Sequence, residues 1–255
     1  MKYILLLLAM TSALAHASES IETIPLDNGN TISVVENVAG GHPKYVLILL
    51  VGSNGVINIQ KAEDGSFKYY KSNFLMRARE WLVSDDIATI APDVPSDQAK
   101  GYTDNFRNSD RHLSDMRKII AYARLKFPQA KVFIVSTSQG SVSSGVLAVK
   151  LGNEIDGVIH TSAMNGNVPG AGLPLWRLNY SLAKSPQLFI HHRDDNCKFT
   201  RFDPIKEKAE KFNIELIEIT GGKGDENRDP CQPFSNHGFY GVEETVAAKI
   251  KGWLK

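Results

Sequence analysis

The sequence lacks any marked excess of charge. Its 255 residues include 29 lysines and arginines against 28 aspartates and glutamates, which gives a formal net charge of +1. No long block of one sign interrupts this balance. Proteins that bind nucleic acids or anionic membrane surfaces usually carry clustered basic charge. We therefore expect neither a nucleic-acid partner nor attraction to a charged membrane surface.

No hydrophobic run is long enough to span a bilayer, and the longest run lies at the start of the chain. Lys2 precedes a short apolar stretch, residues 3–10, and Ala15 and Ala17 supply the small side chains that signal peptidase reads. A bilayer-spanning helix needs about 20 apolar residues, so no stable membrane anchor is expected here. This pattern predicts a signal peptide over residues 1–17, cleaved near Ala17. Residues 18–255 would then be an exported domain, periplasmic or secreted.

Cysteine is scarce, since Cys197 and Cys231 are the only two. An even count in an exported chain indicates one disulfide bond. Two thiols alone do not complete a zinc site, which needs four ligands. His191 and His192 lie near Cys197, but successive residues of a strand point to opposite faces and so do not share one ion. We expect no metal and no cofactor.

The remaining chain alternates between apolar runs of strand length and segments of helical periodicity. Strands are expected at residues 21–25, 31–36, 45–51, 86–91, 131–136, 157–161, 187–191 and 214–219. Helices are expected at residues 72–83, 110–127, 141–151, 203–212 and 242–254. Such alternation predicts a single α/β domain with a mostly parallel, twisted sheet and helices on both faces.

The most informative segment is residues 136–140, Ser-Thr-Ser-Gln-Gly, between a strand and a helix. A sharp turn there lifts one side chain above the carboxyl edge of the sheet. The segment resembles the nucleophile elbow, G-x-S-x-G, of the α/β-hydrolase family, with Ser136 in place of the first glycine. The resemblance extends over essentially the whole mature chain. It implies an α/β-hydrolase fold with Ser138 as the nucleophile, and Ser136 keeps the side chain at its position small.

Acyl transfer also needs two N–H donors where negative charge develops on the carbonyl oxygen. The resemblance implies that the backbone of Gln139 supplies one donor. It places the second in the loop after the third strand, where we assign Ser53, with Asn54 as the alternative. Gly52 and Gly55 let this backbone turn its amides inward. An ordinary glycine turn without a catalytic role is the competing interpretation.

The family order of serine, acid and histidine then selects the remaining partners. His237 stands between the last expected strand and the final helix, which is the family's histidine position. The acid should follow the strand at 187–191, where Asp195 is favoured over Asp194. Asp93 precedes the nucleophile in the chain, so we expect it to be structural. A Cys197–Cys231 bond would tie the acid loop to the histidine loop.

Together these residues predict a serine hydrolase that acts on a small-molecule carboxylic ester through an acyl-enzyme. A peptidase or amidase with the same triad remains an alternative, as does a non-catalytic exported binding protein on this scaffold. The interval between the strands at 157–161 and 187–191 allows only a short lid, which includes Trp176, Leu178 and Tyr180. These side chains would either cover the site or pack against the core.

Overall fold

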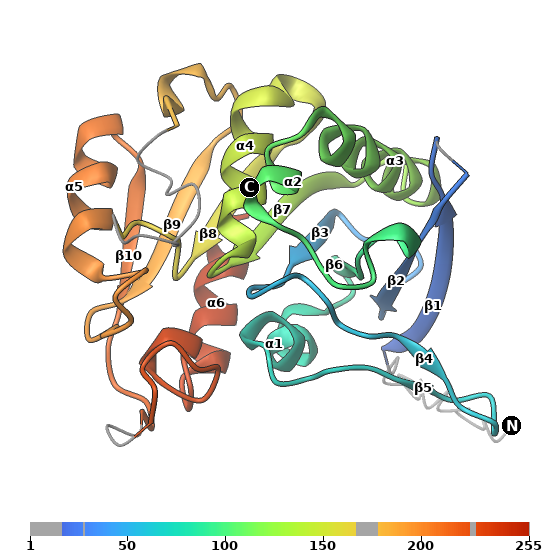
Figure 1. The fold of residues 1–255 in the computed structure, drawn as a ribbon, viewed down its shortest axis with the longest axis horizontal. Helices are drawn as coiled ribbons and strands as arrows, with labels where there is room; N and C mark the ends of the chain where they lie inside the picture. The colour runs from blue at the N-terminus through green and yellow to red at the C-terminus, as the bar shows by residue number, and fades with distance from the viewer. Residues whose placement is uncertain (1–16, 28, 167–177, 225–227, 255) are drawn as a thin grey trace, which may run out of the picture.

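The computed structural model describes residues 17–27, 29–166, 178–224 and 228–254. Its centre is an eight-stranded sheet that runs across the whole molecule (Figure 1). In spatial order the strands are β1 (Ser18–Pro25), β2 (Thr31–Val38), β6 (Ile87–Pro92), β3 (Tyr45–Leu50), β7 (Lys131–Thr137), β8 (Gly157–Thr161), β9 (Gln187–His192) and β10 (Glu215–Ile219).

The six strands from β6 to β10 are parallel, whereas β1 and β2 join the sheet in antiparallel register. All eight expected strands are present, and their ends differ from the expected ones by only a few residues. Their apolar runs are explained by burial on both faces, as in β3 and β7 at the centre. Asn28, in the turn between β1 and β2, lies outside the described residues.

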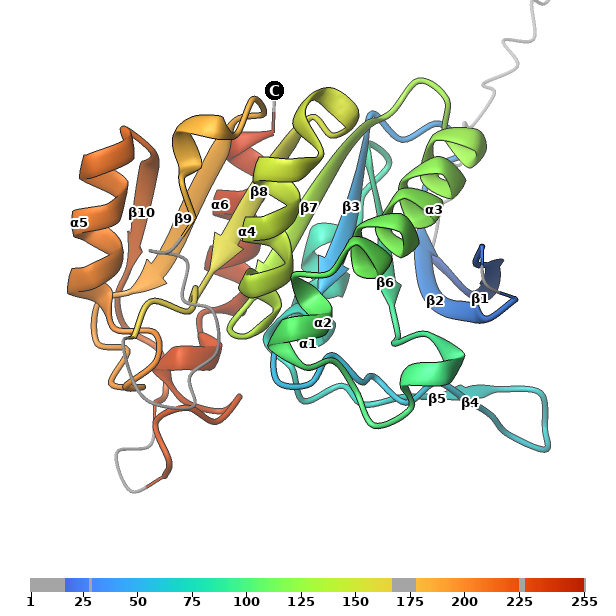
Figure 2. The ribbon, with the colours of Figure 1, turned by 45° about the horizontal axis from the view of Figure 1, so that its top comes forward.

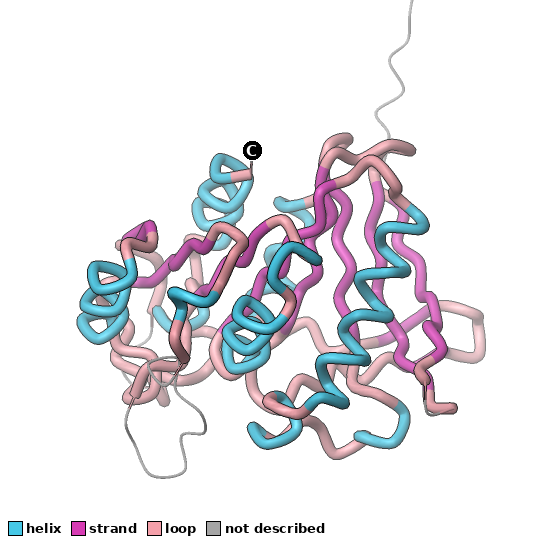
Figure 3. The backbone as a smooth tube through the Cα atoms, turned by 90° about the horizontal axis from the view of Figure 1, so that it is seen from above, coloured by secondary structure: helices cyan, strands magenta, loops and turns pink. Residues whose placement is uncertain are grey.

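The expected helices are present and cover the sheet on both faces (Figures 2 and 3). Buried residues of α3 (Asp110–Lys126), α4 (Gly140–Lys150) and α5 (Phe202–Phe212) share one core cluster with the sheet. Those of α1 (Phe74–Leu82) and α6 (Glu243–Trp253) form the cluster on the opposite face. The structure therefore confirms a single α/β domain. No helix in the described ranges is long and apolar enough to cross a membrane.

Two small elements carry no clear sequence signal. They are the hairpin of β4 (Gln60–Lys61) with β5 (Phe67–Lys68) and the one-turn helix α2 (Asp104–Arg107). Neither is long enough to establish a period of 2 or 3.6 residues. Both belong to the connections that follow strands β3 and β6 at the carboxyl edge of the sheet.

Most of the expected lid, including Trp176, falls within residues 167–177, outside the described part. The two described members, Leu178 and Tyr180, pack against the core. The Tyr180 ring contacts the rings of His160, Phe189 and Phe212 at centroid distances of 5.8–6.1 Å. For these two residues the core interpretation is therefore the correct one.

The start of α4 packs unusually close to the end of β3. A Cβ placed on Gly140 would lie 2.7 Å from the carbonyl oxygen of Val51 and would overlap that of Leu50. Only glycine permits this approach, because both obstacles are backbone atoms that cannot rotate away.

We expect Gly140→Ala to lower the free energy of unfolding by at least about 2 kcal/mol, because the helix must move away from the sheet. Gly252→Ala in α6 is the matched control, since no atom lies within 4 Å of its added Cβ. It should stabilise the protein by up to about 1 kcal/mol through helix propensity. Denaturant unfolding measures both, and equal stabilities would contradict the packing argument.

Candidate active site

Ser138 occupies the turn between β7 and α4 in a left-handed backbone conformation, with φ at 50°. This conformation is uncommon for a residue with a side chain and needs support from its surroundings. The Ser138 N–H donates to the carbonyl of Thr161 at 3.1 Å, and the Ser141 hydroxyl donates to the Ser138 carbonyl at 2.6 Å. A Cβ on Gly52 would lie 2.9 Å from the Ser138 Cβ, so this loop directly adjoins the serine.

His237 reaches Ser138 from the loop before α6. Its Nε2 lies 3.0 Å from the Ser138 Oγ, within hydrogen-bond distance. The loop is fixed from two sides: the Ser162 hydroxyl donates to the carbonyl of His237 at 2.7 Å, and Arg77 donates to that of Gly238 at 2.8 Å. Gly238 itself has no space for a side chain against the Pro233 carbonyl.

The structure places Asp195, and not Asp194, beside this histidine. The Asp195 Oδ2 is 3.1 Å from the His237 Nδ1, and the Asp195 residue is 3% exposed. Its other oxygen accepts from the Cys197 N–H at 2.9 Å. Asp194 is exposed to solvent. With Nδ1–H donating to the carboxylate, Nε2 is left to accept the proton of the Ser138 hydroxyl.

Thr200 is a member of the site that the sequence did not reveal. Its hydroxyl donates to the Asp195 Oδ2 at 2.8 Å and lies 2.9 Å from the His237 Nδ1. It is completely buried, so no water competes for the carboxylate at this point. A threonine in a polar loop carries no motif, and only the fold brings it to this position.

The predicted Cys197–Cys231 disulfide is present in the structure. It joins the segment that follows Asp195 to the segment that precedes His237.

Ligand atoms of Asp195, Cys197 and His237 lie within 4.8 Å of one another, which is a spacing suited to a metal ion. The Cys197 sulfur, however, is bonded to Cys231, so this thiolate is not available as a ligand.

The loop after β3 forms a tight turn, in which the Gly55 N–H donates to the Gly52 carbonyl at 3.1 Å. Ser53 lies within it in the left-handed region, with φ at 53°. Within the described part of the chain, the backbone N–H groups of Ser53 and Gln139 have no backbone acceptor. The two amides assigned from the sequence therefore have no backbone partner that would compete with a ligand.

A cavity of about 530 Å³ opens beside Ser138 and His237. Loop 51–57 lines one side and residues 231–233 line another, while Tyr70 stands at the wall and is 58% exposed. The described side chains that line it include no aspartate, glutamate, lysine or arginine. The cavity therefore offers hydroxyl, amide and apolar groups to a ligand, but no full charge apart from a protonated histidine.

Ser136, which replaces the first glycine of the elbow, faces into the protein. Its Oγ lies 2.6 Å from the Ser144 Oγ, and that hydroxyl lies 2.7 Å from the His160 Nδ1. The Nε2 of the same ring is 2.9 Å from the Gln187 Oε1. The hydroxyl thus joins a buried chain of hydrogen bonds between β7, α4 and β8, which explains why a serine fits where the family pattern has glycine.

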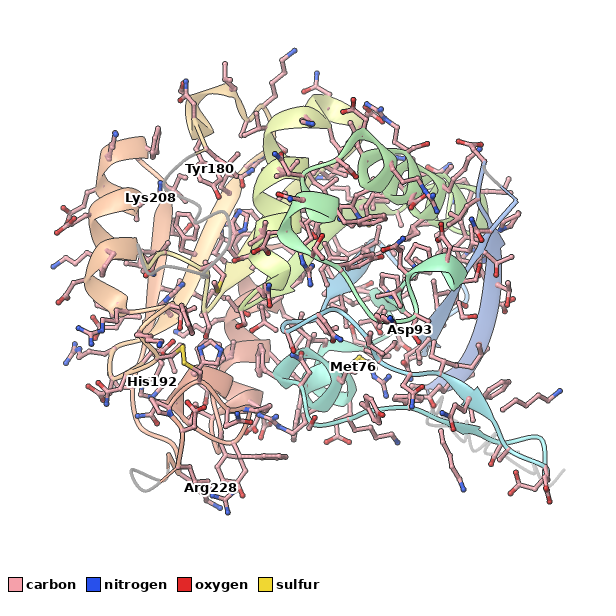
Figure 4. All side chains as sticks on the ribbon, viewed as in Figure 1. Met76, Asp93, Tyr180, His192, Lys208 and Arg228 are labelled. Carbon is pink, nitrogen blue, oxygen red and sulfur yellow. A yellow bond between two sulfur atoms is a disulfide. The ribbon has the colours of Figure 1, made fainter. Side chains whose placement is uncertain are left out.

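Asp93, labelled in Figure 4, directly follows β6 and supports the loop that lines the cavity. Its two carboxylate oxygens accept from the N–H groups of Ile57 and Ile59, each at 2.9 Å. The contacts fix the far end of the loop that adjoins Ser138. They agree with the structural role expected from the sequence.

No family model and no curated protein matches the sequence. Solved structures of similar fold include an α/β serine hydrolase without lid from Xanthomonas campestris, 12% identical, with a TM-score of 0.62 over 95% of this chain and 98% of that one. An α-β serine hydrolase homologue from Coxiella burnetii is 13% identical, with a TM-score of 0.63 over 92% and 97%. An esterase from Pyrococcus furiosus is 15% identical, with a TM-score of 0.59 over 93% of each chain. The chain therefore has the α/β-hydrolase fold.

Four other histidines are buried in the described part of the chain, and burial holds three of them neutral. Burial lowers the pKa of His112 and of His191 to about 3, and that of His160 to about 4. Both ring nitrogens of His112 lack a hydrogen-bond partner among the described residues. In the unfolded chain each ring would titrate near 6.5.

We expect the free energy of unfolding to fall as the pH drops from about 6.5 towards 4. In this window the unfolded chain binds protons that the folded chain excludes, so acid favours unfolding. Each ring contributes a slope of up to about 1.4 kcal/mol per pH unit. His112→Phe should flatten the slope by one proton between pH 6.5 and 5, as measured by denaturant unfolding at several pH values. An unchanged slope would show that this ring titrates alike in the folded and unfolded chains.

Proposed function

We propose that this protein is a serine hydrolase that cleaves a carboxylic ester through an acyl-enzyme. The main support is the 3.0 Å contact between the Ser138 Oγ and the His237 Nε2. Asp195 contacts the other ring nitrogen of His237. A hydroxyl is a weak nucleophile until an adjacent base takes its proton. The buried carboxylate holds the ring in the tautomer that can do so.

The reaction follows from these positions. His237 takes the hydroxyl proton of Ser138 as the Oγ attacks the ester carbonyl, and the resulting oxyanion accepts from the amides of Ser53 and Gln139. The intermediate collapses, and His237 returns the proton to the departing alcohol. Water then gives a proton to His237 and attacks the acyl-enzyme carbonyl. As this second intermediate collapses, His237 returns the proton to the departing Ser138 Oγ, which releases the acid and restores the serine. Asp195 stabilises the imidazolium during both halves.

The surroundings support an uncharged ester of modest size. The volume of about 530 Å³ lies in the ordinary range for small-molecule sites. The neutral described lining offers no counter-ion for a charged acyl group. Similar folds include proteins described as serine hydrolases and as an esterase, which supports the same class of chemistry.

A peptidase or amidase would use the same three residues, and assays with chromogenic esters and aminoacyl amides side by side separate the two.

We further propose that the protein is exported to the periplasm or the medium. The Cys197–Cys231 disulfide supports this, because cytosolic thiols are normally kept reduced.

Ser138→Ala should abolish covalent labelling by a fluorophosphonate and lower kcat for ester hydrolysis by at least about 10³-fold, since no other nucleophile replaces the Oγ. Gel fluorescence and a chromogenic ester assay measure the two effects. Ser181→Ala, an exposed serine away from the cavity, is the control and should behave as the unchanged protein. If the folded protein without any substitution neither reacts with the fluorophosphonate nor hydrolyses the ester, the binding-protein alternative is favoured.

Asp195→Asn should lower kcat by about 10⁴-fold, because the amide no longer holds the ring in the required tautomer. Asp194→Asn makes the same chemical change one position away at an exposed residue, and should alter kcat by less than threefold. Steady-state kinetics on both purified variants decide the assignment. A larger loss in the Asp194 variant would reverse it.

A further inference from the structure

Arg107 lies buried behind the turn that adjoins Ser138. It is the last residue of α2 and is only 1% exposed. Its Nη2 donates to the carbonyl of Ser53 at 2.8 Å, and its Nη1 donates to the hydroxyl of Ser143 at 2.9 Å. The guanidinium also stands over the ring of Tyr102, 5.1 Å from the centroid. One side chain thus bridges the 52–55 turn and helix α4.

This burial is energetically demanding. Among the described residues Arg107 has no ion-pair partner, and its Nε has no hydrogen-bond acceptor. Burial lowers the pKa of Arg107 to about 10, so the group keeps its charge at neutral pH. An unpaired buried charge is costly, whereas an apolar side chain of the same size would fill the space without that cost. Simple space-filling therefore does not explain an arginine here.

The contact acts on the part of the turn that matters for the oxyanion. Peptide groups are planar and trans, so fixing a carbonyl also fixes the direction of the next N–H. The Gly55 N–H holds the Gly52 carbonyl and thereby sets the Ser53 N–H. Arg107 holds the Ser53 carbonyl and thereby sets the Asn54 N–H. The Tyr102 N–H holds the third carbonyl, that of Asn54, at 2.7 Å.

Ser53 also needs such support for its own conformation. Its φ of 53° is unfavourable for a residue with a Cβ, and relaxation would swing the peptides on both sides. The other end of the bridge, Ser143, lies one helical turn beyond Gln139, the second assigned oxyanion donor. Arg107 therefore links the two backbone segments that carry the two assigned amides.

We propose that Arg107 is a positioning residue for the oxyanion hole, which fixes the turn at Ser53 relative to helix α4. The inference rests on the hydrolase function proposed above. An oxyanion exists only in the transition state and the tetrahedral intermediate, so a misplaced donor affects kcat more than KM. A guanidinium can donate to two separate acceptors at once, because its terminal nitrogens form a fork. A lysine ammonium is a single group and does not match this pair of acceptors.

The test uses Arg107→Met, which keeps an apolar stem of similar length, and Arg107→Lys, which keeps the charge without the fork. We expect kcat for a chromogenic ester to fall about 10- to 100-fold in the methionine variant, with KM changed by less than about threefold. The lysine variant should recover part of that loss. Rates are expressed per functional site, counted by fluorophosphonate labelling taken to completion.

His112→Phe is the matched control. The His112 ring belongs to the same buried cluster, 5.1 Å from the Tyr102 ring and 5.7 Å from that of Phe106, but its ring nitrogens make no hydrogen bond to Ser53 or to any other described residue. It should leave kcat per site within twofold of the unchanged protein. A fall of kcat in this control equal to that of Arg107→Met would assign the effect to general packing and overturn the proposal.

Two further outcomes would also overturn it. One is an unchanged kcat per site in Arg107→Met, and the other is a loss confined to KM. Ser138-dependent hydrolysis by the unchanged protein is measured first, so that these results concern Arg107 alone. Absence of that hydrolysis would instead remove the proposed ester chemistry, and the role of Arg107 with it.

Discussion

The close contact between the start of α4 and the end of β3 governs the geometry of this site. Gly140 lies against the backbone carbonyls of Leu50 and Val51, so the helix begins within the space of a side chain from the neighbouring strand. The chain must therefore turn sharply after β7, and Ser138 adopts its left-handed conformation at that turn. The same proximity brings Gly52 against Ser138 and the Ser53 turn beside the helix N-terminus. The proposed nucleophile and the proposed oxyanion donors thus depend on the same packing constraint.

The proposed base and acid come from loops, and these loops are fixed by contacts that take no part in the proposed reaction. Arg77 and Ser162 hold the backbone around His237, and the disulfide joins that segment to the one that carries Asp195. Thr200 fills the remaining position beside the carboxylate. Each contact removes a rotation that would otherwise separate groups that must lie about 3 Å apart for proton transfer. The site thus lies at the carboxyl edge of the sheet, where these two loops are held together.

The sequence predicted the parts of this arrangement that follow from periodicity and chain order. Apolar runs identified all eight strands of the main sheet. The resemblance to the nucleophile elbow, together with the family order of serine, acid and histidine, led to Ser138 and His237. The choice between Asp195 and Asp194 stayed open, because adjacent acidic residues in one loop differ only in how the loop turns. Thr200 and Arg107 were missed for a related reason. Thr200 meets His237, which is 37 residues away in the chain, and Arg107 meets Ser53, which is 54 residues away; nothing local distinguishes either residue from a surface residue.

The distribution of charge shows how such a site can select its substrate. The chain is nearly neutral, and the described cavity lining contains no aspartate, glutamate, lysine or arginine, so long-range attraction contributes little to binding. The buried guanidinium of Arg107, near the site, is turned towards a carbonyl and a hydroxyl of the protein itself. Discrimination must then come from shape and from hydrogen bonds that tighten as the carbonyl becomes tetrahedral. Such a site depends on the positions of a few backbone amides more than on any charged side chain that contacts the ligand.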